Sequence, residues 1–125
     1  MESAANRRSH QRIVVGPDVT IRFQVKEFAF QDVRITNLSA DGCFATLPHS
    51  EHHLFQQGTL LEQFRFETPD LDGGPIIGRV AYVLGLGPGE MAIIGLGIHF
   101  TALTPAMAKA LLQYVGARVL EHPAP

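Results

Sequence analysis

Hydrophobic and polar residues alternate along the first part of the chain, a pattern typical of half-buried β-strands. In residues 18–26, the apolar positions that share one face are Val19, Ile21, Phe23 and Val25. Strand patterns also cover residues 28–36, 43–47, 60–68, 76–84 and 91–100. About six strands at short spacing, with no helix between them, favour a small antiparallel barrel over a parallel sheet.

Turn residues separate these predicted strands. The pair Gly16-Pro17 precedes the first strand, and residues 69–75 form a loop rich in Pro, Asp and Gly. Three glycines fall within residues 85–89, between the last two strands. Because Gly and Pro favour turn conformations, we expect these last strands to form a hairpin with a flexible tip.

The hydrophobic period changes near the C-terminus. Thr104 is a favourable N-cap residue, and Pro105 suits the first position of a helix. Apolar residues then recur every four positions, at Met107, Leu111, Val115 and Val119. This spacing predicts an amphipathic helix of about four turns. We expect its apolar stripe to cover the barrel, with binding of a partner protein as the alternative.

Composition and charge narrow the classes of function. A chain of 125 residues with 46% hydrophobic residues has the size of a single domain with a buried core. The net charge of −2 and the pI of about 6.3 argue against general binding of DNA or RNA. Residues 1–12 are nevertheless basic, with three arginines against Glu2. A basic segment on a mildly acidic body suits a small anionic ligand.

The sequence also bears on the cellular compartment. No apolar run approaches the roughly 18 residues that a membrane helix needs, so we expect no membrane insertion. Residues 1–6 lack the pattern of a secretory signal. The single cysteine, Cys43, cannot form an internal disulfide. We therefore expect a cytoplasmic protein.

The basic segment carries Arg7, Arg8 and Arg12 ahead of the first strand. A guanidinium group is planar, permanently charged and forked. It can therefore grip a phosphate, or the O6/N7 edge of guanine, with two parallel hydrogen bonds. It can also stack on a purine face.

A polar segment follows about 25 residues later, with the sequence Asn-Leu-Ser-Ala-Asp-Gly at residues 37–42. We expect it to form a turn that ends one strand and starts the next. Asn37 and Ser39 offer amide and hydroxyl groups for a base edge or a phosphate. Gly42 allows a strained turn or a close approach of the backbone to a ligand.

Taken together, the two segments read as Arg-x-x-x-Arg followed by (Asp/Asn)-x-Ser-x-x-Gly, which resembles the paired signature of the PilZ domain family. Residues 78–83 and 95–100 resemble later strands of that family, so the similarity covers about residues 7–120. The resemblance implies an all-β fold, a six-stranded antiparallel barrel with a C-terminal α-helix. It also implies a bacterial receptor for the second messenger cyclic di-GMP (c-di-GMP).

Two positions depart from the family pattern. Asn37 stands where Asp is common, which keeps a carbonyl acceptor but removes a negative charge. Tyr82 stands where many relatives carry Trp, and it is the candidate for base stacking. The ligand-binding residues that the resemblance implies are Arg7, Arg8, Arg12, Asn37, Ser39 and Gly42.

The resemblance also suggests how the protein signals. We expect residues 1–16 to be a flexible arm that carries the arginine motif, and residues 17–121 to be the barrel with its helix. Ligand would order the arm against the barrel and change the surface offered to a downstream protein. The alternative is an adaptor of pilus or flagellar machinery that does not depend on the nucleotide. Binding of one ligand or of an intercalated pair stays open, as does the oligomeric state.

Other groups of reactive residues have simpler interpretations. One loop holds three histidines and a glutamate, but no second cluster of Cys or His follows at a matching distance, so we expect no metal site. These residues are His49, Glu51, His52 and His53. His99 lies between apolar residues of a strand, and we expect it on the outer face.

The sequence offers no catalytic set. Asp70 and Asp72 lie on a loop rich in Gly and Pro, where Asp is an ordinary turn residue. Cys43 lies in an apolar strand, where a small core residue is a better interpretation than a nucleophile. Without a nucleophile, base and orienting group, we do not expect an enzyme.

Overall fold

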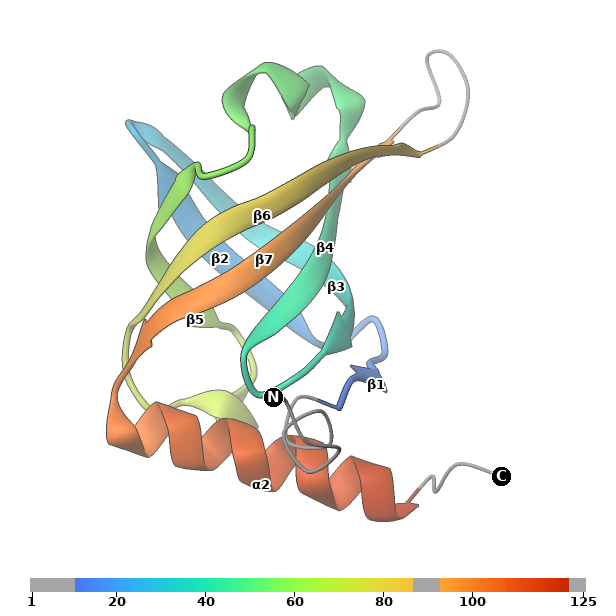
Figure 1. The fold of residues 1–125 in the computed structure, drawn as a ribbon, viewed down its shortest axis with the longest axis vertical. Helices are drawn as coiled ribbons and strands as arrows, with labels where there is room; N and C mark the ends of the chain where they lie inside the picture. Colours follow the sequence, from blue (N-terminus) through green and yellow to red (C-terminus); the bar gives the residue numbers. More distant parts are fainter. Residues whose placement is uncertain (1–10, 87–92, 122–125) are drawn as a thin grey trace, which may run out of the picture.

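The structure is a computed structural model and describes residues 11–86 and 93–121. In this part of the chain, strands wrap into a barrel and one long helix lies across its end (Figure 1). The strands are β1 (Ile13–Val14), β2 (Thr20–Val25), β3 (Phe28–Leu38), β4 (Gly42–Pro48), β5 (Leu60–Phe66), β6 (Ile76–Leu86) and β7 (Ile93–Leu103). The helices are η1 (His49–Leu54), η2 (Pro69–Leu71) and α2 (Pro105–Glu121), of which η1 and η2 are 3-10 helices.

Six strands close the barrel in the order β2-β3-β4-β7-β6-β5, and β5 pairs back to β2. Every pairing is antiparallel. This arrangement confirms the predicted all-β fold with a C-terminal helix. The wall of β2 and β5 lies opposite the wall of β4 and β7, because the two pairs are separated by β3 on one side and by β6 on the other.

The short strand β1 lies outside the ring of six strands, and the alternation of hydrophobic and polar residues does not predict it. It pairs with the end of β3, with Ile13 opposite Leu38 and Val14 opposite Asn37. A turn closed by a hydrogen bond from the Val19 amide to the Gly16 carbonyl (3.2 Å) then leads into β2. Ile13 is buried whereas Val14 is 88% exposed, so a single side chain anchors this short strand.

The end of β3 differs from the sequence-based prediction. We expected the turn to begin at Asn37, but the strand continues to Leu38. Asn37 pairs with Val14 of β1 on one side and with Phe44 of β4 on the other. Pairing on both sides holds Asn37 in extended conformation, so the turn begins only at Ser39.

Helix α2 begins as predicted. The Thr104 hydroxyl accepts a hydrogen bond from the Met107 amide (3.0 Å), which makes Thr104 the N-cap, and it donates one to the Gly73 carbonyl (2.7 Å). Met107 and Leu111 are buried in the same core as the barrel residues. The apolar stripe therefore covers one end of the barrel, as expected. No helix in residues 11–86 and 93–121 has the length and apolar character to cross a membrane.

Candidate functional site

The two sequence motifs meet at the end of β3. Arg12 immediately precedes β1, and the pairing of Val14 with Asn37 brings it beside that strand. The Arg12 Nη1 atom donates a hydrogen bond to Asn37 Oδ1 over 2.7 Å. A guanidinium group has five N–H donors, so this bond uses one of them. Two segments that lie 25 residues apart in the sequence thus present a cation and an amide side by side.

The turn after β3 is held together by its own side chains. Ser39 is fully buried, and its hydroxyl donates a hydrogen bond to Asp41 Oδ1 over 2.6 Å. The Ser39 amide donates to the Gly42 carbonyl (2.8 Å), and the Phe100 amide of β7 donates to the Asp41 carbonyl (2.8 Å). Ser39 thus fixes the shape of the turn from inside, and its predicted contact with a ligand stays a prediction.

Gly42 is required by the close approach of β7. A Cβ atom built at this position would lie 2.3 Å from the Ile98 carbonyl oxygen, which is a backbone atom of the paired strand. Any side chain would push β4 and β7 apart. The glycine of the motif therefore keeps the turn tight against the barrel wall.

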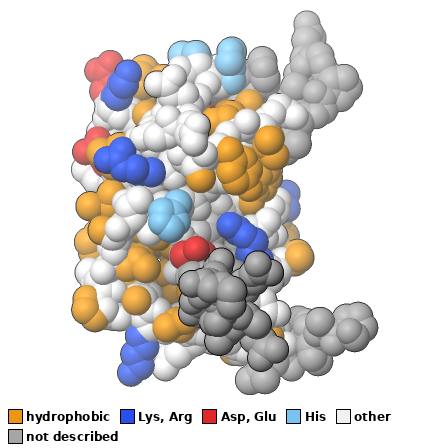
Figure 2. Space-filling model, viewed as in Figure 1, with side chains coloured by type: hydrophobic (Ala, Val, Ile, Leu, Met, Phe, Trp, Pro, Cys, Tyr) orange, Lys and Arg blue, Asp and Glu red, His pale blue; other side chains and the backbone are white. Residues whose placement is uncertain are grey.

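An aromatic surface adjoins this turn on the outer face of β4, β7 and β6. Phe44, Gly97 and Tyr82 are opposite one another in these three strands. The Tyr82 ring lies on Gly97, where a Cβ would be 2.2 Å from a ring carbon, and it is 44% exposed. The Phe44 ring lies 6.2 Å away at a tilt of 33°. Figure 2 shows hydrophobic side chains grouped on this side of the barrel, above basic and acidic ones.

Phe44 was not among the residues predicted from the sequence. Its signal is the period of two along β4, which places it on the same face as Gly42. His99 is exposed, as expected for the outer face, and is opposite Gly42 on β7. The outer wall beside the turn is thus lined by two aromatic rings and an imidazole.

Cys43 points into the barrel. It is fully buried, and burial raises the pKa of its thiol far above the ordinary value, while the nearby charge of Arg12 lowers this pKa in part. The thiol is therefore neutral and a poor nucleophile. This confirms the interpretation of Cys43 as a core residue.

Beside Arg12, a cleft of about 510 Å³ separates residues 11–19 from the C-terminal half of α2. Arg118 lines this cleft, with its guanidinium carbon 3.4 Å from the centre of the Tyr114 ring. This cation–π contact holds the Arg118 guanidinium group in place on the Tyr114 ring. With Arg12 and Arg118 against Asp18, the lining of the cleft has a net positive charge.

Arg7 and Arg8, which the family resemblance assigns to ligand binding, lie outside the described residues. His52 and His53 are exposed on η1, and Asp70 lies in η2. Among residues 11–86 and 93–121, no three His, Cys, Asp or Glu side chains are grouped in a way that could hold a metal ion.

Comparison with known protein families gives one match. The family described as the PilZ domain matches residues 6–117, which is most of the chain. Comparison with curated proteins gives no significant match.

Solved structures share the fold at low sequence identity. The PilZ domain of YcgR from Escherichia coli, solved with c-di-GMP, has a TM-score of 0.67 and 16% identity over 92% of this chain and 93% of that domain. The c-di-GMP complex of K. pneumonia MrkH has a TM-score of 0.77 and 15% identity over 92% of this chain. The inhibitor of motility MotI/DgrA from Bacillus subtilis has a TM-score of 0.74 and 20% identity over 94% of this chain. The chain spans about half of MrkH and MotI, at 53% and 54% of their lengths.

Proposed function

Because this chain belongs to the PilZ domain family, we propose that it is a receptor for c-di-GMP and not an enzyme. The observation that carries the proposal is the hydrogen bond between Arg12 and Asn37, which joins the arginine motif to the polar turn. The fold shared with YcgR and MrkH, both solved with c-di-GMP, supports it. The positive cleft beside Arg12 would attract an anionic ligand.

The arginines would bind the ligand's phosphates and guanines. Arg12 is exposed, and its bond to Asn37 can be exchanged for a bidentate pair with a phosphate. We assign Arg7 and Arg8 to the same clamp. Asn37, once released, would offer its amide to a base edge, while Ser39 and Gly42 hold the turn.

The aromatic surface on β4 and β6 would provide the stacking contacts for the ligand's bases. Tyr82 is 44% exposed, and the adjacent Phe44 widens the surface that it offers. Stacking on aromatic rings contributes about 1–3 kcal/mol per base in nucleic-acid complexes. Replacement of the family's common Trp by Tyr would thus weaken stacking without removing it.

We further propose that the ligand fixes residues 1–10 against the barrel. Binding that fixes a segment changes the surface seen by other proteins, which is a common form of signal output. The receiver would be a downstream protein that distinguishes the bound from the free form.

The test is calorimetric titration of c-di-GMP into the wild type and into Arg8→Ala and Arg12→Ala. Loss of a charge-assisted contact is expected to lower affinity by tenfold or more in each variant. Arg34→Ala is a matched control, since Arg34 is an exposed arginine on β3. Circular dichroism checks that each variant keeps the barrel. Wild-type affinity in both motif variants would refute the site.

A thermal-shift experiment separates this function from the nucleotide-independent adaptor. A ligand that binds only the folded state must raise the melting temperature. No shift at a large excess of c-di-GMP would favour the adaptor.

A further inference from the structure

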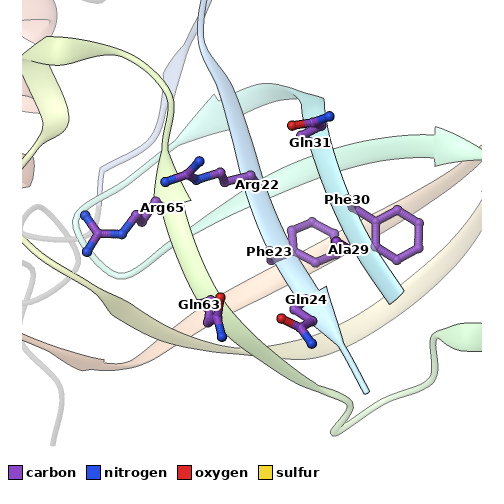
Figure 3. A pocket seen from close by; sticks show the side chains of 8 residues that line it. All are labelled: Arg22, Phe23, Gln24, Ala29, Phe30, Gln31, Gln63 and Arg65. Atoms are coloured by element: carbon purple, nitrogen blue, oxygen red, sulfur yellow. The ribbon is translucent and has the colours of Figure 1, made fainter. Parts of the chain in front are cut away.

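A second polar hollow lies away from Arg12 and Asn37, toward the other end of β3. It lies over β2, β3 and β5 and has a volume of about 360 Å³ (Figure 3). The side chains that matter for its chemistry are Arg22, Gln24, Phe30, Gln31, Gln63 and Arg65. Two cations, three amides and one aromatic ring thus share one hollow.

The two arginines are directly opposite each other in adjacent strands, Arg22 on β2 and Arg65 on β5. Like charges in this position destabilise a sheet. Among the described residues, the Arg22 side chain makes no hydrogen bond or ion pair. Within the described part of the chain, the Arg65 side chain pairs only with Asp72, at 4.0 Å, and these two side chains are 43% and 75% exposed. Across residues 11–86 and 93–121, direct ion pairs therefore compensate little of this positive charge, although Glu67 and Asp72 line an adjoining hollow with both arginines.

Glu67, which follows β5 and lines an adjoining hollow together with both arginines, is engaged in other hydrogen bonds. Glu67 Oε1 accepts hydrogen bonds from the Thr20 hydroxyl and from the Asp32 amide, both at 2.9 Å. These bonds hold Glu67 beside the paired arginines without an ion pair to either of them. The wall thus keeps two guanidinium groups available to an external anion.

Backbone strain accompanies this arrangement. Gln63 has a φ of 51° and Asp32 a φ of 55°, values that residues other than glycine rarely adopt. The pairing of β5 with β6 shifts between Leu61 and Phe64, so Gln63 lies in a bulge and is exposed next to Glu62. A bulge of this kind redirects a side chain, and such strain is concentrated at binding sites. The bulge at this position turns the side-chain amide of Gln63 toward the hollow.

Figure 3 shows how the groups are distributed. The side chains of Arg22 and Arg65 lie at one end, with the Arg65 guanidinium group extending outward from β5, and the amides of Gln24 and Gln63 lie farther along the same strands. Phe30, a half-buried residue, lies on the β3 side. An elongated ligand with one anionic end would match this distribution.

We propose that the hollow binds a small phosphate ester. Two neighbouring guanidinium forks suit the doubly charged phosphate better than a single carboxylate. The volume is in the range of small-molecule sites and exceeds what one phosphate ion fills. The glutamine amides and Phe30 would contact the organic part of the ligand.

The test is a titration followed by two-dimensional NMR of the full chain at constant ionic strength. The probes are inorganic phosphate, GMP, glucose 6-phosphate and glycerol 3-phosphate. Phosphate is expected to shift the amide signals of Arg22 and Arg65, and at least one ester is expected to bind about fivefold more tightly than inorganic phosphate. No shift at tens of millimolar phosphate would overturn the proposal. Equal affinity for phosphate and for all three esters would overturn the assignment to an ester.

Variants locate the site. Arg22→Gln and Arg65→Gln are each expected to weaken binding by about tenfold, because each removes one charged fork. Lys109→Gln removes a positive charge from an exposed position on α2 and should leave the affinity within twofold. Equal weakening in all three variants would show a general charge effect and overturn the site. Arg12→Ala should not change these shifts, which keeps the test independent of the c-di-GMP site.

Discussion

At the scale of single residues, two glycines shape the candidate site in different ways. Gly42 faces backbone, so a side chain there would separate two strands of the barrel. Gly97 faces the Tyr82 side chain, which lies 44% exposed and has room to move. Substitution at Gly97 therefore tests the aromatic surface without opening the barrel.

We predict that Gly97→Ala keeps the fold but displaces the Tyr82 ring. The new methyl group would lie 2.2 Å from a ring carbon, so the ring must rotate away. Such overpacking is expected to lower the free energy of unfolding by about 1–3 kcal/mol. If Tyr82 stacks on a guanine, c-di-GMP affinity should fall severalfold. NMR signals of the Tyr82 ring and calorimetry measure the two effects.

Gly85→Ala is the matched control for this substitution. Gly85 lies on β6, and a Cβ built there meets no atom within 4 Å. It should change neither the Tyr82 signals nor the affinity. Unaltered Tyr82 signals in Gly97→Ala would contradict the packing described here.

At the scale of secondary-structure elements, the long strands and the helix could be predicted because their signals are local. Alternation of buried residues such as Ile21 and Phe23 defines β2, and Thr104 with Pro105 marks the start of α2. β1 has two residues and exists only because the end of β3 is close to it. The bulge at Gln63 and the alignment of Phe44 with Tyr82 depend on strand register, which one sequence does not reveal.

The candidate site could likewise be predicted from the sequence only in part. The family resemblance pointed to Arg12 and Asn37, and the structure places them in contact. It gave no indication that the Ser39 hydroxyl is buried, or that Arg22 and Arg65 are opposite each other on adjacent strands. Those facts depend on which residues are opposite each other after folding.

The start of α2 gives a prediction at this scale. Thr104→Ala removes the N-cap bond to Met107 and the bond to the Gly73 carbonyl, so the free energy of unfolding should fall by about 1–2 kcal/mol. Urea denaturation measures the change. Thr104→Ser keeps a hydroxyl and should recover most of the loss. Thr101→Ala removes one exposed bond to the Ile77 carbonyl and should have a smaller effect. Equal losses at Thr101 and Thr104 would contradict the capping role.

At the scale of the whole molecule, the closed barrel shields its core side chains from solvent and reagents. These side chains therefore become accessible together when the barrel opens. Cys43, the single cysteine, lies on β4 between β3 and β7 and is fully buried. Only the thiolate reacts with disulfide reagents, and burial raises the pKa of this thiol in the folded state. In the unfolded chain the pKa returns to about 8.5, so reaction at pH 8 reports opening of the barrel.

We predict that c-di-GMP protects Cys43 from labelling, although no contact between them is required. A ligand that binds only the folded state lowers the population of open molecules by the factor 1 + [L]/Kd, or about 100-fold at 100 times Kd. Labelling at pH 8 under conditions where closing outpaces reaction should slow by this factor, whereas Arg12→Ala, with about tenfold lower affinity, should be protected only about tenfold at the same ligand concentration. Labelling that is equally fast with and without ligand in the wild type would mean that β4 opens locally while the site stays intact, or that no ligand is bound. Calorimetry on the same sample separates these two outcomes, because only the first retains binding heat.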